Sequence, residues 1–145
     1  MTAFDLHIVF DCANPDLVAR FWMEALGGYD FPMPVPDGFT TWDDWADAQG
    51  IPVDQRPTTR TLVDKTRNRP DIFFLKVPES KSGKNRLHLD IKVAPGLTGA
   101  DRLLKIKAEG ERLTALGATL LQTIDEPDSF HLIMQDPEGN EFCVA

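Results

Sequence analysis

The chain has 145 residues, a length that suits one domain with its own hydrophobic core. Its 42% hydrophobic and 26% charged residues are typical of a globular protein, and a net charge of −8 argues against nucleic acid or anionic membrane surfaces as partners. No apolar run approaches the roughly 20 residues that span a bilayer, the N-terminus does not resemble a signal peptide, and two cysteines are compatible with a reducing compartment. We therefore expect a cytoplasmic protein.

The first part of the chain predicts a strand, a helix and three further strands. Alternating apolar residues predict a strand over 4–12. The sequence Asn14-Pro15-Asp16 begins a helix that ends at Gly27-Gly28. A short strand near 29–31 precedes a proline-rich loop and a short helix, which begins at the capping-box sequence Thr41-Trp42-Asp43-Asp44. Strands are predicted over 60–64 and 71–77.

The second part repeats this order after a charged connector at 78–85. It predicts a strand over 86–93, a helix over 99–116 in which Gly110 allows close packing against a sheet, and a strand over 118–122. The last two strands, over 129–135 and 140–144, form a hairpin around the turn at 136–139. We expect one domain over 1–145, with one module at about 4–77 and a second at about 86–145.

Two histidines have the same local setting in the two modules. His7 lies in Leu6-His7-Ile8-Val9, and His88 lies in Leu87-His88-Leu89-Asp90, 81 positions further on (88 − 7). Each begins a strand-like run that is followed by a helix ending in Ala-Leu-Gly. This pattern indicates one half-domain used twice, and a polar pocket between the two related halves is the expected place for function.

Further sequence features complete a family pattern. In addition to the two histidines, they are Asn14-Pro15, Phe21-Trp22, Ala25-Leu26-Gly27, Val77-Pro78-Glu79, Lys84 to Asp90, and Asp136-Pro137-Glu138-Gly139-Asn140-Glu141-Phe142. With these features the chain resembles the vicinal oxygen chelate superfamily, the glyoxalase, bleomycin-resistance and dioxygenase group, and within it the glyoxalase-like domain proteins. The resemblance implies an α+β fold, in which two βαβββ modules form a curved mixed sheet, or half-barrel, around a central pocket. It also implies a homodimer.

Metal-dependent members of this superfamily hold a divalent ion with four side chains, from the first and last strands of each module. The resemblance places His7 and His88 at two of these positions and Cys143 at a third, where a glutamate is usual. The fourth position falls on Leu75, or on Phe74, and neither can bind a metal. Two imidazoles and a thiolate suit Zn²⁺, whereas Mg²⁺, Mn²⁺ and Ca²⁺ prefer oxygen ligands. The alternative is that the histidines are hydrogen-bonding pocket residues and no metal is bound.

Other residues are candidates for catalysis or binding. Asp90 follows His88 by two positions on one strand face, so the pair could act as general acid and base, or form part of a polar pocket lining. Arg86 on the same face could pair with an anionic substrate or be a solvated strand end, and Glu141 shares a face with Cys143. Trp42 and Trp45 are three apart on the short helix, and they either cover an aromatic ligand or fix this helix to the sheet.

Two functions follow from the resemblance. The first is a small-molecule binding protein of the bleomycin-resistance kind, with a ligand in the inter-module pocket, to which Leu75 contributes, and no metal. The alternative is a zinc-type lyase, isomerase or dioxygenase. The acidic balance and the apolar Leu75 or Phe74 favour binding or metal-free chemistry. No nucleophile motif or glycine-rich phosphate loop is present.

Overall fold

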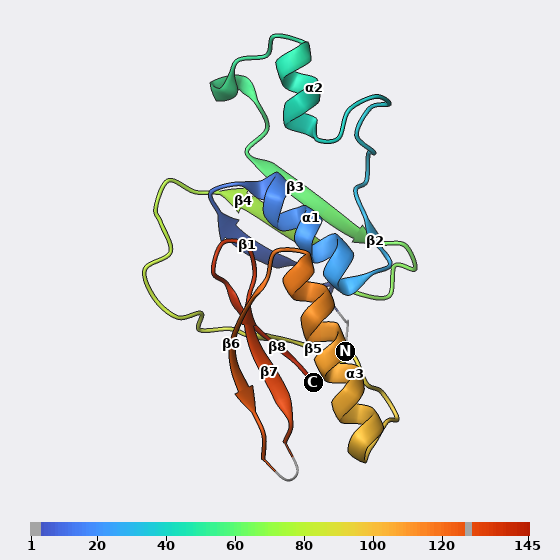
Figure 1. Ribbon diagram of the computed structural model, residues 1–145. Helices are drawn as coiled ribbons and strands as arrows, with labels where there is room; N and C mark the ends of the chain where they lie inside the picture. Colours follow the sequence, from blue (N-terminus) through green and yellow to red (C-terminus); the bar gives the residue numbers. More distant parts are fainter. Residues whose placement is uncertain (1–3, 127–128) are drawn as a thin grey trace. The chain divides into compact units, whose positions relative to one another are not determined.

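Two units with the same order of elements make up the part of the chain that the computed structural model describes, residues 4–126 and 129–145. The units are Met1–Ser80 and Lys81–Ala145. Each has a strand, a helix and three more strands, and each forms one four-stranded mixed sheet (Figure 1). The predicted α+β fold with two βαβββ modules is therefore confirmed.

In the first unit the strand order is β1-β4-β3-β2, with β1 parallel to β4 and the other neighbours antiparallel. The elements, in chain order, are β1 (Ile8–Cys12), α1 (Pro15–Leu26), β2 (Tyr29–Asp30), α2 (Trp42–Ala48), the 3₁₀ turn η1 (Val53–Gln55), β3 (Thr59–Asp64) and β4 (Ile72–Lys76). The strands β1 and β2 are thus the two edges of this sheet.

Helix α1 covers one face of the first sheet. It begins where predicted, because the Asn14 side chain accepts a hydrogen bond from the Leu17 amide at 3.1 Å and proline occupies the first turn. Trp22 contacts Phe10 at a ring distance of 5.1 Å, and Phe10 stacks on Phe74 at 5.4 Å. Leu17, in the first turn of α1, is 46% exposed.

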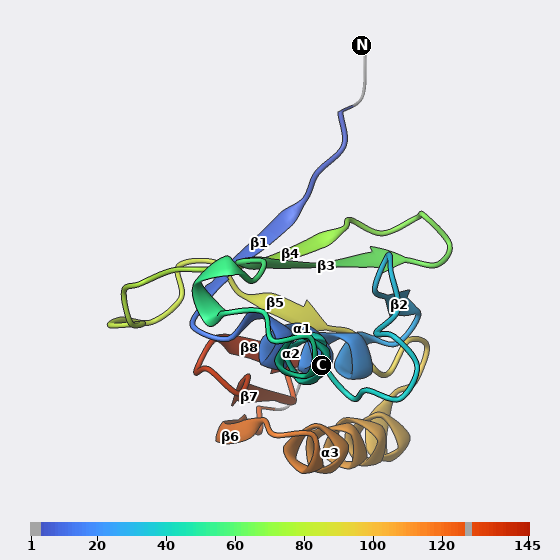
Figure 2. The ribbon, with the colours of Figure 1, turned by 90° about the horizontal axis from the view of Figure 1, so that it is seen from above.

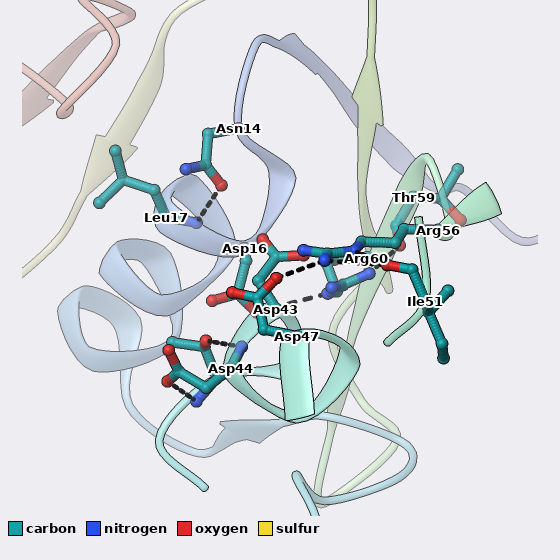
Figure 3. A network of polar contacts seen from close by, with 11 residues as sticks. Asn14, Asp16, Leu17, Asp43, Asp44, Asp47, Ile51, Arg56, Thr59 and Arg60 are labelled. Atoms are coloured by element: carbon teal, nitrogen blue, oxygen red, sulfur yellow. Dashed lines mark hydrogen bonds and ion pairs between the residues drawn. The ribbon is translucent and has the colours of Figure 1, made fainter. Parts of the chain in front are cut away.

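The segment between β2 and β3 is an insertion stabilised largely by its own contacts. Thr41 and Asp44 form the predicted capping box at the start of α2. Arg56 donates to the carbonyl of Ile51 and pairs with Asp43 and Asp47, all within the insertion (Figure 3). Figure 1 shows α2 beyond the end of β3 rather than on the face of the sheet.

The second unit repeats the topology, with strand order β5-β8-β7-β6 and a parallel β5–β8 pair. Its elements are β5 (Leu89–Ile91), α3 (Gly99–Ala115), β6 (Thr119–Ile124), β7 (His131–Gln135) and β8 (Glu141–Val144). Helix α3 covers one face of this sheet (Figure 2). The close packing predicted at Gly110 is confirmed, since a Cβ there would collide with the side chain of Leu132.

The first strand of each unit is shorter than predicted, and both histidines lie immediately outside it. The strands begin at Ile8 rather than residue 4 and at Leu89 rather than residue 86. In the second unit, Glu141 accepts a hydrogen bond from the Asn85 amide at 2.9 Å, which ties the connector to the start of β8. The parallel ladder of the second unit begins at the pair of Leu89 and Phe142, one residue after the start of β8.

Each unit also has a buried aspartate at the turn that joins its last two strands. Asp64 accepts hydrogen bonds from the Thr66 hydroxyl and from the Asn68 and Arg69 amides. These donors, the Thr66 hydroxyl most of all, hold the pKa of Asp64 well below its usual range despite its burial. Asp136 accepts from the amide of Glu138 and from both nitrogens of Asn140.

Candidate functional site

The first candidate residue, His7, lies beside an aromatic ring on the open face of the first sheet, the face that α1 does not cover. Its imidazole is 5.0 Å from the ring of Phe73, with the two planes tilted by 33°. Phe73 pairs with Val9 across the parallel ladder. His7 also lines a mostly polar pocket of about 370 Å³ together with Arg67, Asp71 and neighbouring residues of the two segments.

This open face has two rows of paired residues. One row, Val9–Phe73–Thr61, is largely apolar, and the next runs from Asp11 through Leu75 to Thr59, so it has a carboxylate at its β1 end. Val9 is 58% exposed and Leu75 is 38% exposed. Leu75 therefore faces away from α1, whereas the alternative position, Phe74, is fully buried on the α1 side and is excluded from this face.

Next to these rows, the insertion forms an apolar pocket of about 220 Å³. Its lining residues come from the proline-rich loop, from α2 and from β3: Phe31, Pro32, Met33, Trp42, Pro57, Thr59, Arg60 and Thr61. Trp45 meets Trp42 edge-on, with ring centroids 5.6 Å apart, and so supports it from α2. Of the two predicted tryptophans, Trp42 lines this pocket and Trp45 holds it in place.

A cluster of charges borders the same pocket at Arg60. The carboxylate of Asp16, which is 5% exposed, accepts from Arg20 at 2.7 Å. It also lies 3.4 Å from Arg60 (Figure 3). Arg60 also donates to the carbonyl of Thr59 at 3.0 Å. Two guanidinium groups share one carboxylate here, so the cluster has a net positive charge.

In the second unit, Asp90 and Cys143 are neighbours on the face that α3 does not cover. They are directly paired between β5 and β8, and the Cys143 thiol donates a hydrogen bond to Asp90. Burial, followed by the charge and hydrogen bond of Asp90, raises the pKa of Cys143. The thiol is therefore protonated near neutral pH, whereas metal binding and nucleophilic attack both require a thiolate.

The contacts of the other second-unit candidates differ from the predicted pairs. Asp90 lies 3.8 Å from Lys92, and among the described residues no hydrogen bond joins it to His88. His88 and Arg86 are exposed in the segment before β5. Glu141 binds the Asn85 amide and lies 3.2 Å from Lys81. Burial acts to raise the pKa of Glu141, but these donors outweigh it and lower the pKa to about 2.

These residues do not suit the divalent metal that the family resemblance implies. Leu75 has no ligating atom, and the Glu141 carboxylate is engaged by Asn85 and Lys81 of the connector. Within either unit, over residues 4–126 and 129–145, no group of three or more His, Cys, Asp or Glu could hold a metal ion. We therefore derive no chemical step through a metal.

No direct signal in the sequence identifies Phe73, Phe31 and Met33 as site residues. Phe73 belongs to the run Ile72-Phe73-Phe74-Leu75, in which every residue is apolar, so alternation cannot assign the faces. Phe31 and Met33 lie in a loop with three prolines, where no periodicity exists to interpret. The capping box of α2 was the usable signal, because it located Trp42 on a helix.

Neither cysteine forms a disulfide in the described part of the chain. Over the same residues, no helix is long and apolar enough to cross a membrane.

Comparisons with known proteins agree with this architecture. The family model described as "Glyoxalase-like domain" matches residues 7–145. No curated protein sequence matches the chain significantly. A glyoxalase/bleomycin resistance protein/dioxygenase family enzyme from Burkholderia phytofirmans PsJN is similar in structure, with a TM-score of 0.61, 15% identity, and coverage of 95% of this chain and 94% of that chain.

Two further solved structures have the same fold. A glyoxalase-related enzyme from Fulvimarina pelagi has a TM-score of 0.60 and 15% identity, over 100% of this chain and 88% of that one. The fosfomycin resistance protein FosX from Mesorhizobium loti has a TM-score of 0.58 and 10% identity, over 99% of this chain and 91% of that one. These identities support the fold alone, whereas the family match spans almost the whole sequence. The chain belongs to the glyoxalase-like domain family.

Proposed function

We propose that this glyoxalase-like domain protein binds a small planar aromatic molecule, without a metal, in the Trp42 pocket of its first unit. The observation that supports this proposal is the apolar pocket between the proline-rich loop, Trp42 and β3. Its volume of about 220 Å³ suits one or two fused rings. Small-molecule pockets are mostly apolar with a few placed polar groups, and this one has that composition.

The position of the pocket relative to the open face supports the same conclusion. Thr59 and Thr61 line the pocket, and they pair across the sheet with Leu75 and Phe73. A ring held against Trp42 therefore lies near the row Val9–Phe73–Thr61, and a larger ligand can extend along this row. The hydroxyls of the two threonines provide hydrogen-bonding groups beside this apolar surface.

Charge defines which aromatic molecules suit the pocket. Arg60 lines it, and the Asp16–Arg20–Arg60 cluster has one more positive than negative group. A substituent that accepts a hydrogen bond, such as a carboxylate or phenol oxygen, is favoured near Arg60, whereas an ammonium group is disfavoured. We therefore propose an aromatic ligand that is anionic or neutral.

Tryptophan fluorescence with three probes of one ring system tests this proposal. We expect 2-naphthoate to bind most tightly, 2-naphthol less tightly and 2-(aminomethyl)naphthalene most weakly. Trp42→Ala should weaken naphthoate binding about 5-fold, because aromatic stacking is worth roughly 1 kcal/mol. Trp45→Phe is the matched control and should change affinity little, since a phenyl ring keeps the edge-on support. Equal affinities for the three probes, or unchanged binding in Trp42→Ala, would refute the proposal.

Metal-free binding is tested separately. We expect purified protein to contain far less than one equivalent of zinc, and naphthoate affinity to be unchanged by a chelator. Stoichiometric zinc whose removal abolishes binding would instead support the metal-dependent lyase, isomerase or dioxygenase. For the acid–base pair, His88→Ala should leave probe affinity unchanged, because His88 is not among the lining residues.

The homodimer and the cytoplasmic location expected from the sequence stay predictions. The same applies to the single domain over 1–145 and to substrate roles for His7, Arg86 and Glu141.

A further inference from the structure

An apolar groove lies between helix α3 and the two outer strands of the second sheet. Its volume is about 350 Å³. The lining residues come from α3, β6, β7 and the position before β7: Lys107, Gly110, Glu111, Thr114, Leu120, Thr123, Phe130, Leu132 and Met134. All of them belong to the second unit, and none lines the Trp42 pocket of the first. The groove is therefore a separate candidate binding site.

The floor of this groove is largely aliphatic. Leu132 and Met134 of β7 are buried, and they pair across the ladder with Thr123 and Leu120 of β6. Leu132 points toward α3, since a Cβ at Gly110 would collide with it. Residues two apart on a strand share a face, so all four of these side chains lie on the α3 side of the sheet. Leu120 is 48% exposed, and the floor is thus open on the side of β6.

The wall that α3 forms has one positive and one negative side chain, Lys107 and Glu111, which we call the groove pair. They are four residues apart and lie on one face of the helix. The Lys107 ammonium is 5.7 Å from the ring centroid of the buried Phe130, a cation–π contact. Within the part of the chain that the structure describes, neither member of the groove pair forms an ion pair. Both charges can therefore bind a ligand that lies on the aliphatic floor.

A second pair on the same helix shows that the open arrangement is not a result of spacing. Lys105 and Glu109 have the same residue types at the same separation, and their charged groups are 3.0 Å apart. Their pair lines no part of the groove. The ring of Phe130 beside Lys107 is the contact that distinguishes the groove pair from this closed pair.

We propose that the groove binds a free α-amino acid with an aliphatic side chain. The ligand carboxylate pairs with Lys107, the ligand ammonium pairs with Glu111, and the side chain lies on Leu120, Leu132 and Met134. The two charges of the lining cancel, so a ligand with one charge of each sign matches them. An alkyl anion would leave Lys107 paired but bring its charge near Glu111, and an alkyl cation has the reverse mismatch. This inference does not depend on ligand binding in the first unit.

An amide NMR titration of the full chain with free leucine tests the ligand class. We expect saturable shift changes at Thr114, Leu120 and Thr123. Isocaproate lacks the ammonium group of leucine and isoamylamine lacks its carboxylate, and each should bind about fivefold more weakly, the upper range for an exposed ion pair. Glycine has both charges without the side chain and should bind more weakly still. Absence of saturable leucine binding, or equal affinity for leucine and both analogues, would overturn the proposal.

Substitutions in the groove pair test which charge binds which group. Lys107→Gln should remove the advantage of leucine over isoamylamine, and Glu111→Gln should remove its advantage over isocaproate. The matched control is Lys105→Gln with Glu109→Gln, which makes the same changes in the closed pair and should leave all three affinities unchanged. Equal losses in the control and in the groove-pair variants, or unchanged preferences in those variants, would contradict the assignment.

Discussion

The two units have the same topology but present different chemistry. In both, the first and last strands are parallel neighbours, one helix covers one face, and a buried aspartate shapes the turn between the last two strands. The open face of the first unit presents Val9, Phe73 and Leu75 beside Asp11, whereas the second presents Asp90 and Cys143 on its parallel strands β5 and β8. The backbone pattern is duplicated, but the side chains on the two open faces differ in chemistry. We propose ligand binding for the first unit.

The buried turn aspartates are the strongest test of the shared architecture. Asp136→Ala removes three hydrogen bonds to a buried carboxylate, and we expect it to lower the free energy of unfolding by about 3 kcal/mol. Asp64→Ala should also be clearly destabilising. Urea unfolding measures both, with the exposed Asp37→Ala as control. A loss similar to the control in either variant would show that the two turns are not equivalent.

The close approach of α3 to its sheet is specific to the second unit. Gly110→Ala should destabilise the protein by about 1–2 kcal/mol, although alanine is the better helix former, because its Cβ collides with Leu132. Adding Leu132→Ala should recover part of this loss in a double-mutant cycle measured by urea unfolding. Additive losses from the two substitutions would contradict the contact.

A pH dependence distinguishes the connector of the second unit. The pKa of Glu141 is about 2 in the folded protein and about 4.3 in an unfolded chain. Its contribution to stability is therefore complete above about pH 4.3 and is lost as the pH falls toward 2. Glu141→Gln should lower stability at neutral pH and flatten the acid limb of the pH–stability curve. An acid limb identical to that of the parent would contradict the bonds to Asn85 and Lys81.

The smallest effect concerns the first turn. Arg67 has a positive φ of 59°, a conformation that costs an ordinary side chain little in a turn but costs glycine less. Arg67→Gly should raise the free energy of unfolding by roughly 0.5 kcal/mol at most, and with it the melting temperature slightly. The gain is small because glycine also loses more entropy on folding. Arg67→Val should lower the melting temperature, because a β-branched residue is strained at this φ. The opposite order of these two variants would contradict the turn geometry.

Much of the fold could be predicted from the sequence because its signals are local. The Asn14 cap, the Thr41 capping box and the turn at Asp136 depend on residues a few positions apart, and all three are confirmed. The lengths of β1 and β5 were overestimated. The ladder of β1 begins with β4 at Ile72, and that of β5 begins where Leu89 meets Phe142, and no local pattern in 4–12 or 86–93 shows these starts.

The candidate site was harder to predict because its contacts are not local. Trp42 was identified from helical spacing, but its neighbours Phe31 and Thr61 come from a loop and a strand. Asp90 was expected to act with His88, and the structure pairs it with Cys143, which is far along the chain. The sequence did not decide whether Leu75 or Phe74 lies on the open face, and the strand register shows that it is Leu75.

The most direct test of the central claim, that the first unit binds an aromatic ligand beneath Trp42, is a two-dimensional amide NMR titration with 2-naphthoate. The account predicts saturable shift changes at Phe31, Met33, Trp42 and Thr61, with small changes elsewhere in the first unit and throughout the second. Shift changes confined to the second unit, or no saturable change at these four residues, would contradict it.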